Sequence, residues 1–201
     1  TLVVYAADHG LALGSHGLLG KQNLYEHSVR SPMILTGPGI PKGISTHAFT
    51  YLLDLVPTLA ELTGVRMPHE LDGHSLRPLW QDTTASLRDT VFLAYAGPGK
   101  AKMRAIRDER FKLIIYPQIN HRQLFDLSDD PHETRDLAAN PQQRPNIDRM
   151  TSVLRRSQRD YGDTQALEVS EPASKGINLS GRRRTPDRWQ PQWIVQKYFR
   201  P

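Results

Sequence analysis

The chain has 201 residues, of which 38% are hydrophobic and 23% are charged, a composition that supplies a packed core and excludes wholesale disorder. The absence of cysteine excludes disulfides, thiolate zinc sites, iron–sulfur clusters and a cysteine nucleophile encoded in these residues. The net charge of +5 is concentrated in residues 175–201, which carry +6 against −1 for the remainder, so a nucleic-acid-binding body is not expected. No apolar run reaches the roughly 18 residues that a membrane span needs.

The first forty residues predict two buried strands joined by a loop. Residues 2–7 form a short apolar, β-branched run that is typical of a central strand. The glycines of residues 10–20 predict a loop, and residues 32–36 predict a second buried strand, since Gly37-Pro38-Gly39 cannot continue a ladder. Because the chain starts directly on an apolar strand without methionine, we expect it to be the C-terminal portion of a longer polypeptide.

Residues 54–63 predict a helix. Asp54 is suited to cap its start, Pro57 falls in the first turn, and Gly64 is a natural stop. An apolar stripe runs along one face of this helix. The order strand, loop, strand, helix indicates an α/β fold.

Beyond residue 90 the pattern changes to consecutive strands followed by a helix. The predicted strands are residues 91–95, 103–107 and 111–116, with 123–127 as a candidate fourth. Residues 141–161 predict a helix that has Ile147, Met150 and Leu154 on one face. We therefore expect residues 1–90 to be an α/β domain portion, 91–165 a small antiparallel sheet with a helix, and 166–201 an extended basic tail.

Asp8-His9-Gly10 follows the first predicted strand, and the first two side chains are candidate metal ligands. In open α/β sheets, ligands bind beyond the carboxyl ends of the strands. A carboxylate oxygen and an imidazole nitrogen can face one divalent cation, although such an ion needs further ligands. Asp and His are also common residues at strand exits, so the tripeptide alone leaves both interpretations open.

An ordered series of motifs surrounds this tripeptide. It consists of Asp8-His9-Gly10, Gly14-Ser15-His16-Gly17, Gly20-Lys21, Tyr25-Glu26 with Val29-Arg30 and Pro32, Gly37-Pro38-Gly39, Asp54-Leu55-Val56-Pro57, Asp72-Gly73, and Leu124-Phe125-Asp126-Leu127. In this order and spacing, residues 1–140 resemble the sulfatase family of the alkaline phosphatase-like superfamily. The resemblance fades in the helix at 141–161 and is absent from the tail.

The resemblance implies roles for four residues. Asp8 and His9 match two ligands of a calcium-type metal, and Lys21 matches a lysine that contacts the sulfate group. An ammonium is a compact charge suited to the oxygens of an anionic ester, whereas the alternative for Lys21 is an ordinary surface lysine. His16 either lines the site and donates a proton to the leaving group or holds the glycine-rich loop by hydrogen bonds. Glu26 and Arg30 are expected to form a structural ion pair, four residues apart on one helix face.

The implied function is hydrolysis of a small-molecule or carbohydrate sulfate ester by a formylglycine nucleophile and a calcium ion. No C/S-x-P-S/A-R motif, from which formylglycine is made, occurs in these residues, so we expect the nucleophile upstream of Thr1 and the isolated chain to be inactive. Two alternatives remain open. One is a phosphoesterase or phosphotransferase of the same superfamily, and the other is a non-catalytic interaction module that binds an acidic partner through the tail.

Overall fold

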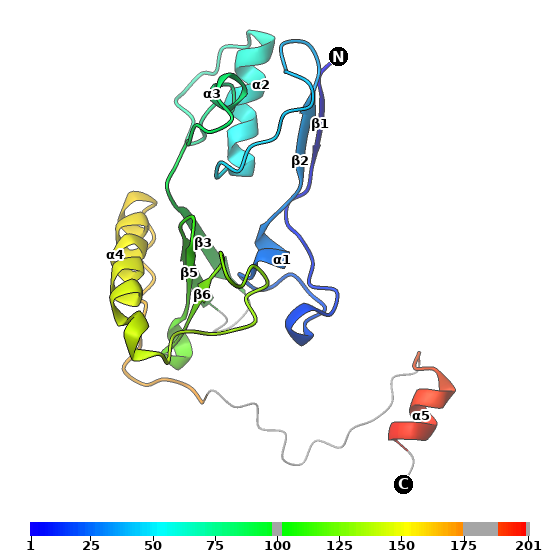
Figure 1. The fold of residues 1–201 in the computed structure, drawn as a ribbon, viewed down its shortest axis with the longest axis vertical. Helices are drawn as coiled ribbons and strands as arrows, with labels where there is room; N and C mark the ends of the chain where they lie inside the picture. Colours follow the sequence, from blue (N-terminus) through cyan, green and yellow to red (C-terminus); the bar gives the residue numbers. More distant parts are fainter. Residues whose placement is uncertain (98–101, 175–188, 200–201) are drawn as a thin grey trace.

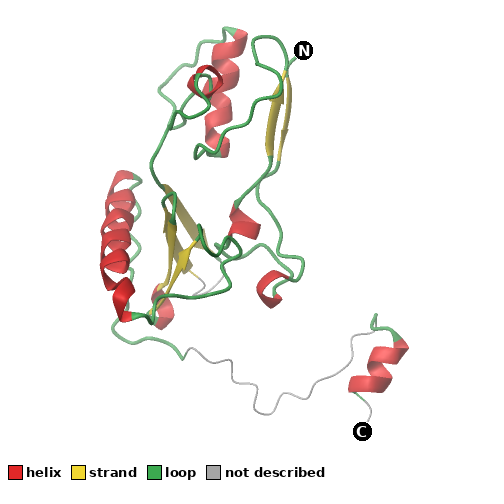
Figure 2. Ribbon diagram, viewed as in Figure 1, coloured by secondary structure: helices red, strands yellow, loops and turns green. Residues whose placement is uncertain are grey.

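The computed structural model describes residues 1–97, 102–174 and 189–199 of the chain. A two-stranded ribbon and the helices α2 and α3 form one group of elements, and a four-stranded sheet with the long helix α4 forms another (Figure 1). None of the helices described combines the length and the apolar character that crossing a bilayer requires. Figure 2 shows how much of the first group is loop rather than regular structure.

The ribbon consists of β1 (Val3–Ala6) and β2 (Met33–Thr36), which pair antiparallel. The prediction that these two segments are buried is wrong, because Val3, Tyr5 and Ile34 are 53%, 61% and 60% exposed. Each strand has one partner among the described residues, and a ribbon of two strands cannot cover its own apolar faces. The apolar composition therefore fixes the extended conformation here without producing burial.

Short helical elements lie between β1 and β2 and between β2 and the four-stranded sheet. They are η1 (Ser15–Gly17), α1 (Glu26–Val29), η2 (Leu52–Asp54), α2 (Leu55–Thr63) and α3 (Pro78–Gln81). The predicted loop at residues 10–20 is confirmed apart from the single turn η1. The predicted helix is confirmed as α2, and it ends at Gly64, whose φ of 69° is the left-handed conformation that favours glycine at this position.

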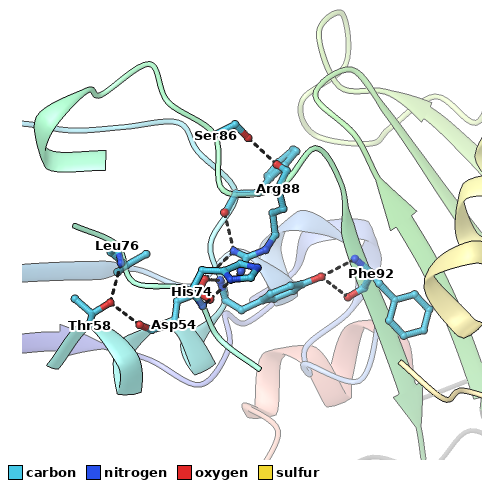
Figure 3. A network of polar contacts seen from close by, with 9 residues as sticks. Asp54, Thr58, His74, Leu76, Ser86, Arg88 and Phe92 are labelled. Carbon is cyan, nitrogen blue, oxygen red and sulfur yellow. Dashed lines mark hydrogen bonds and ion pairs between the residues drawn. The ribbon is translucent and has the colours of Figure 1, made fainter. Parts of the chain in front are cut away.

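Asp54 lies at the centre of a buried polar network. The prediction that its side chain caps α2 is wrong, because the carboxylate makes no cap hydrogen bond to that helix. Instead the fully buried side chain accepts the backbone N–H of Tyr51 at 2.6 Å and that of His74 at 2.9 Å. The guanidinium of Arg88 donates to both carboxylate oxygens, at 2.7 and 2.8 Å (Figure 3).

The same network reaches the edge of the four-stranded sheet. The Arg88 guanidinium lies 4.5 Å from the centre of the Tyr51 ring. The Tyr51 hydroxyl accepts the backbone N–H of Phe92 at 2.8 Å and donates to the carbonyl of the same residue at 3.2 Å (Figure 3). A side chain from the segment before α2 thus takes the place of a neighbouring strand and ties the first group of elements to the sheet.

The sheet is an antiparallel meander whose strands lie side by side in chain order. Its strands are β3 (Val91–Ala96), β4 (Lys102–Arg107), β5 (Phe111–Tyr116) and β6 (His121–Asp126). The single turn η3 (Pro117–Ile119) connects β5 to β6. All four predicted strands are confirmed, although β6 begins two residues earlier than expected. The hairpin connection between β4 and β5 occupies residues 108–110.

Both faces of the sheet are covered. After the single turn η4 (Pro141–Gln143), α4 (Arg144–Asp160) packs on one face, and its buried residues include Ile147, Met150 and Leu154 as predicted. The other face carries Leu24 together with Tyr25 and Val29, from α1 and the residues before it. Figure 1 shows α4 and α1 on opposite sides of the sheet. Coverage on both faces explains why β5 is apolar apart from Lys112.

The predicted extended tail, residues 166–201, is only partly extended. Leu167 is 8% exposed and packs into the core beneath α4, and the backbone N–H of Ala173 donates to the carbonyl of Gln118 at 2.8 Å. Residues 166–174 are thus docked on the sheet domain. The expectation of an extended chain is wrong for α5 (Gln192–Tyr198), which is helical. The arginine cluster at residues 182–184 lies outside the described residues.

The fold predicts an acid-sensitive contact between the sheet and the end of α4. Arg104 forms two hydrogen bonds with Asp163, at 2.7 and 2.8 Å, and these lower the pKa of the Asp163 carboxyl to about 2 against the opposing effect of burial. The stabilisation from the Arg104–Asp163 contact is complete above the pKa that Asp163 has in the unfolded chain, about 4. It is lost as the pH falls from there through the folded pKa of about 2. We expect Asp163→Asn to cost about 2 kcal/mol of unfolding free energy at neutral pH and less than about 0.5 kcal/mol at pH 2, measured by urea denaturation. A cost that does not change with pH would contradict this.

Candidate active site

Asp8 and His9 lie in the turn that follows β1, and this turn rests on α1. The backbone N–H of Gly10 donates to the carbonyl of Ser28 at 2.8 Å. A Cβ atom at position 10 would overlap the carbonyl oxygen of His27, so only glycine permits this close approach. The position of the Asp8-His9 pair is therefore set by α1 and not by the ribbon alone.

The two predicted metal ligands face one another. The His9 Nδ1 donates to the carbonyl of Gly10 at 2.8 Å, which leaves Nε2 as the ring nitrogen that faces Asp8. This Nε2 atom lies 3.0 Å from Oδ2 of Asp8. An imidazole nitrogen and a carboxylate oxygen at this separation can both face one cation.

The ammonium of Lys21 is the cation beside this pair. Its Nζ atom hydrogen-bonds to Nε2 of His9 and lies 4.0 Å from Oδ2 of Asp8. An ammonium only donates, so Nε2 of His9 is the acceptor in this contact. The structure therefore brings three of the four predicted residues into one cluster, on the surface and accessible from solvent, since the side chains of Asp8 and Lys21 are 77% and 46% exposed.

His16 makes its contacts elsewhere. Its Nε2 atom donates to the backbone carbonyl of His132 at 3.0 Å, and its ring stacks on that of Tyr25 with 4.1 Å between the ring centres. These contacts support the interpretation that His16 holds the glycine-rich loop. Burial lowers the pKa of the neighbouring His27, and the charges of His16 and Lys112 lower it further.

A group of charged residues that the sequence analysis missed lies beneath α1. The predicted Glu26–Arg30 ion pair is wrong: α1 ends at Val29, and the Glu26 carboxylate points to the sheet, where it lies 2.6 Å from Arg107 and 3.1 Å from Lys112. Lys112 is fully buried and also lies 2.8 Å from Glu133. The sequence held one signal for this group: Lys112 interrupts the otherwise apolar run of β5. A lysine within a buried strand needs a nearby carboxylate.

A cavity of about 810 Å³ lies away from this cluster. It is lined by residues 47–49, by part of 83–89, by 108–111 and by Arg149. None of Asp8, His9, His16 and Lys21 lines it. The candidate site is thus an open surface cluster rather than an enclosed pocket.

Asp8 and His9 supply two of the ligand atoms that a divalent metal site needs, but they do not form a complete coordination shell. A separation of 3.0 Å is close to that of adjacent ligands on an octahedral cation with bonds of roughly 2.1–2.4 Å. Within the parts of the chain that the structure describes, no group of three or more His, Asp or Glu residues is arranged to hold a metal ion. Asp8 and His9 can therefore contribute two ligands and need others.

Comparison with known proteins gives the same family from sequence and from structure. The family described as "N-sulphoglucosamine sulphohydrolase, C-terminal" matches residues 14–160. A choline-sulfatase of Rhizobium meliloti (strain 1021) is 37% identical over 175 residues, which are 85% of this chain and 33% of that protein. This chain thus spans about a third of the length of that relative.

Two solved structures extend the comparison. One, a complex with its substrate D-glucosamine-2-N,6-O-disulfate, matches with a TM-score of 0.75 at 27% identity, over 82% of this chain and 35% of that one. A phosphonate monoester hydrolase from Silicibacter pomeroyi matches with a TM-score of 0.71 at 28% identity, over 82% of this chain and 36% of that one. Since the family match covers most of the residues, the chain belongs to the N-sulphoglucosamine sulphohydrolase C-terminal family of sulfatases, with the alkaline phosphatase-like fold.

Proposed function

We propose that the protein to which these residues belong hydrolyses sulfate esters, and that Asp8, His9 and Lys21 form this chain's part of the active site. The observation that carries the proposal is the cluster itself: a carboxylate oxygen and an imidazole nitrogen 3.0 Å apart with an ammonium beside them. The family supports the reaction class. Because the chain spans about a third of its relatives, the nucleophile and the other metal ligands belong, in this proposal, to the rest of the protein.

Each residue has a distinct task in the proposed reaction. Asp8 and His9 would hold a divalent cation, calcium by the family resemblance, and such an ion, when bound, draws negative charge from the oxygens of the transferring group. Lys21 would leave its contact with His9 and bind a sulfate oxygen. His16 keeps the glycine-rich loop in place through the carbonyl of His132. The proposed nucleophile is a formylglycine outside these residues.

The relatives indicate the substrate class. The named activities include choline sulfate hydrolysis, and one of the matched structures holds a sulfated glucosamine. We propose a small-molecule or carbohydrate sulfate ester as the substrate.

A phosphorus ester is the second candidate, because a phosphonate monoester hydrolase has nearly the same fold similarity. A tetrahedral oxyanion of either element fits the charges at the cluster. Rates with 4-nitrophenyl sulfate and with 4-nitrophenyl phenylphosphonate, measured on the same full-length preparation, separate the two. The non-catalytic alternative requires that neither ester is hydrolysed and that a polyanion binds with steep salt dependence.

The metal assignment predicts the effect of Asp8→Ala in the full-length protein. Removing one charged ligand from an oxygen-rich site should lower calcium affinity at least tenfold and lower sulfatase activity with it. Calcium titration by calorimetry and a 4-nitrophenyl sulfate assay measure the two effects. Asp160→Ala, at an exposed position in the last turn of α4, is the matched control and should change neither. Unchanged calcium affinity in Asp8→Ala would overturn the assignment.

A further inference from the structure

Two cations face each other on the side of the sheet that carries α1. Arg107 on β4 and Lys112 on β5 are directly paired across the two strands. Like charges in this arrangement repel, and the side chain of Lys112 is fully buried, which deprives it of water. An arrangement this costly persists only where other groups neutralise it.

Two carboxylates supply the neutralisation, and both also hold α1. The Glu26 carboxylate bridges the two cations, with one oxygen 2.6 Å from Arg107 and the other 3.1 Å from Lys112. Glu133 places one oxygen 2.8 Å from Lys112, and its other oxygen accepts the backbone N–H of Glu26 at 2.6 Å. The first residue of α1 is therefore fixed through its side chain and through its backbone at once.

The turn that contains Glu133 is shaped for this contact. Glu133 has a φ of 55°, a left-handed conformation that costs free energy in a residue other than glycine, and it is 2% exposed. Its neighbour His132 offers the carbonyl that accepts the hydrogen bond from His16. One short turn after β6 thus holds both α1 and the glycine-rich loop.

The support continues from α1 to the candidate site. Ser28 of α1 accepts the backbone N–H of Gly10, the residue next to His9, and His27 fills the space where a side chain at Gly10 would lie. The chain of contacts runs from Lys112 and Glu133 through Glu26 to the turn of Asp8 and His9.

We propose that Lys112 and Glu133 are positioning residues for the metal ligands Asp8 and His9. They touch neither the metal nor the ester, and they act by holding α1, and with it Gly10, in one place. This inference rests on the proposed function, since it assigns the purpose of the contacts to the metal site.

A matched control exists on the opposite face of the same sheet. Arg104 is also a buried cation on a strand, and its partner Asp163 lies 2.7 Å away, but this pair contacts the end of α4 and not α1. Removing either cation removes a buried ion pair and should lower the melting temperature. Only the removal of Lys112 should disturb the site.

The experiment compares Lys112→Met, Glu133→Gln and Arg104→Met in the full-length protein. Three quantities are measured: the melting temperature, amide hydrogen exchange in the peptide that contains Gly10, and the dissociation constant for calcium alone. We expect exchange at Gly10 to accelerate at least tenfold, and calcium binding to weaken at least fivefold, in the Lys112 and Glu133 variants. In Arg104→Met both should stay within twofold of wild type while the melting temperature falls. Glu133→Gln keeps the test decisive if Lys112→Met does not fold.

Each outcome decides between the inference and the function on which it rests. Equal effects of all three variants on Gly10 and calcium would overturn the inference, because the cluster would then act only through general stability. The inference alone is also overturned if Asp8→Ala weakens calcium binding while Lys112→Met and Glu133→Gln do not. If Asp8→Ala leaves calcium binding unchanged, the proposed function fails, whatever the other variants show.

Discussion

Replacing Lys21 by alanine in the full-length protein should lower kcat/KM for a sulfate ester by about 30- to 1,000-fold, equivalent to about 2–4 kcal/mol of transition-state stabilisation. The reason is that an ammonium held beside the proposed metal ligands is in place to bind the charge of the transferring group. The same substitution removes a positive charge next to Asp8 and His9. Calcium affinity should therefore stay unchanged or rise, the opposite of the effect of Asp8→Ala.

This opposition of signs separates a sulfate-binding lysine from a general defect. Lys42→Ala, at an exposed position in the loop after β2, removes the same charge far from these residues in the chain and should leave kcat/KM unchanged. Steady-state kinetics and calcium calorimetry on both variants provide the measurement. A kcat/KM for Lys21→Ala within about threefold of wild type would mean that Lys21 is an ordinary surface lysine.

Arg88→Met should lower the unfolding free energy by on the order of 3–5 kcal/mol, because it leaves the buried carboxylate of Asp54 without its partner. Burial opposes ionisation of Asp54, yet the Arg88 guanidinium and the N–H groups of His74 and Tyr51 together hold its pKa below the ordinary value. Without the guanidinium this pKa should rise. The cost of the substitution should therefore shrink as the pH falls and Asp54 takes up a proton, which urea denaturation at several pH values would measure.

A surface ion pair in the same part of the fold is the control for Arg88. Arg77 lies 2.5 Å from Glu61, but both side chains are nearly half exposed, so Arg77→Met should cost less than about 1 kcal/mol. The double variant Arg88→Met/Asp54→Leu should be more stable than Arg88→Met alone, since no unpaired charge remains. Equal costs for the Arg88 and Arg77 variants would show that the network in Figure 3 does not join the two groups of elements.

The sequence predicted those parts of the fold that depend on local periodicity. Apolar spacing and signals such as Gly64 predict α2, the four strands of the meander and the inner face of α4. Burial of one face of an element is enough to place its apolar residues at regular intervals in the sequence. The order of motifs also pointed to Asp8, His9 and Lys21, which the structure brings together. In each case the informative residues lie close to one another in the chain.

What the sequence could not predict depends on partners far away in the chain. Asp54 is a residue type that commonly caps helices, but its carboxylate instead pairs with Arg88, 34 residues later in the chain. Glu26 has the spacing for an ion pair with Arg30, but it pairs instead with Arg107 and Lys112, 81 and 86 residues away. These two cations are less hydrated and therefore bind the carboxylate more strongly. Local rules fail at these positions because buried charges select their partners by proximity in space.

The contacts that hold α1 on the sheet also set an order of events during synthesis on the ribosome. The strands of the meander pair only with their neighbours in the chain, so the sheet can form soon after its residues emerge. α1, by contrast, has to wait for Glu133, which follows Glu26 by 107 residues. At a synthesis rate of about 5–20 residues per second, the turn of Asp8 and His9 spends roughly 5 to 20 s without its support. During that interval the exposed apolar ribbon and the unsupported side chains of Asp8 and His9 are together accessible to chaperones and to metal ions in the cell.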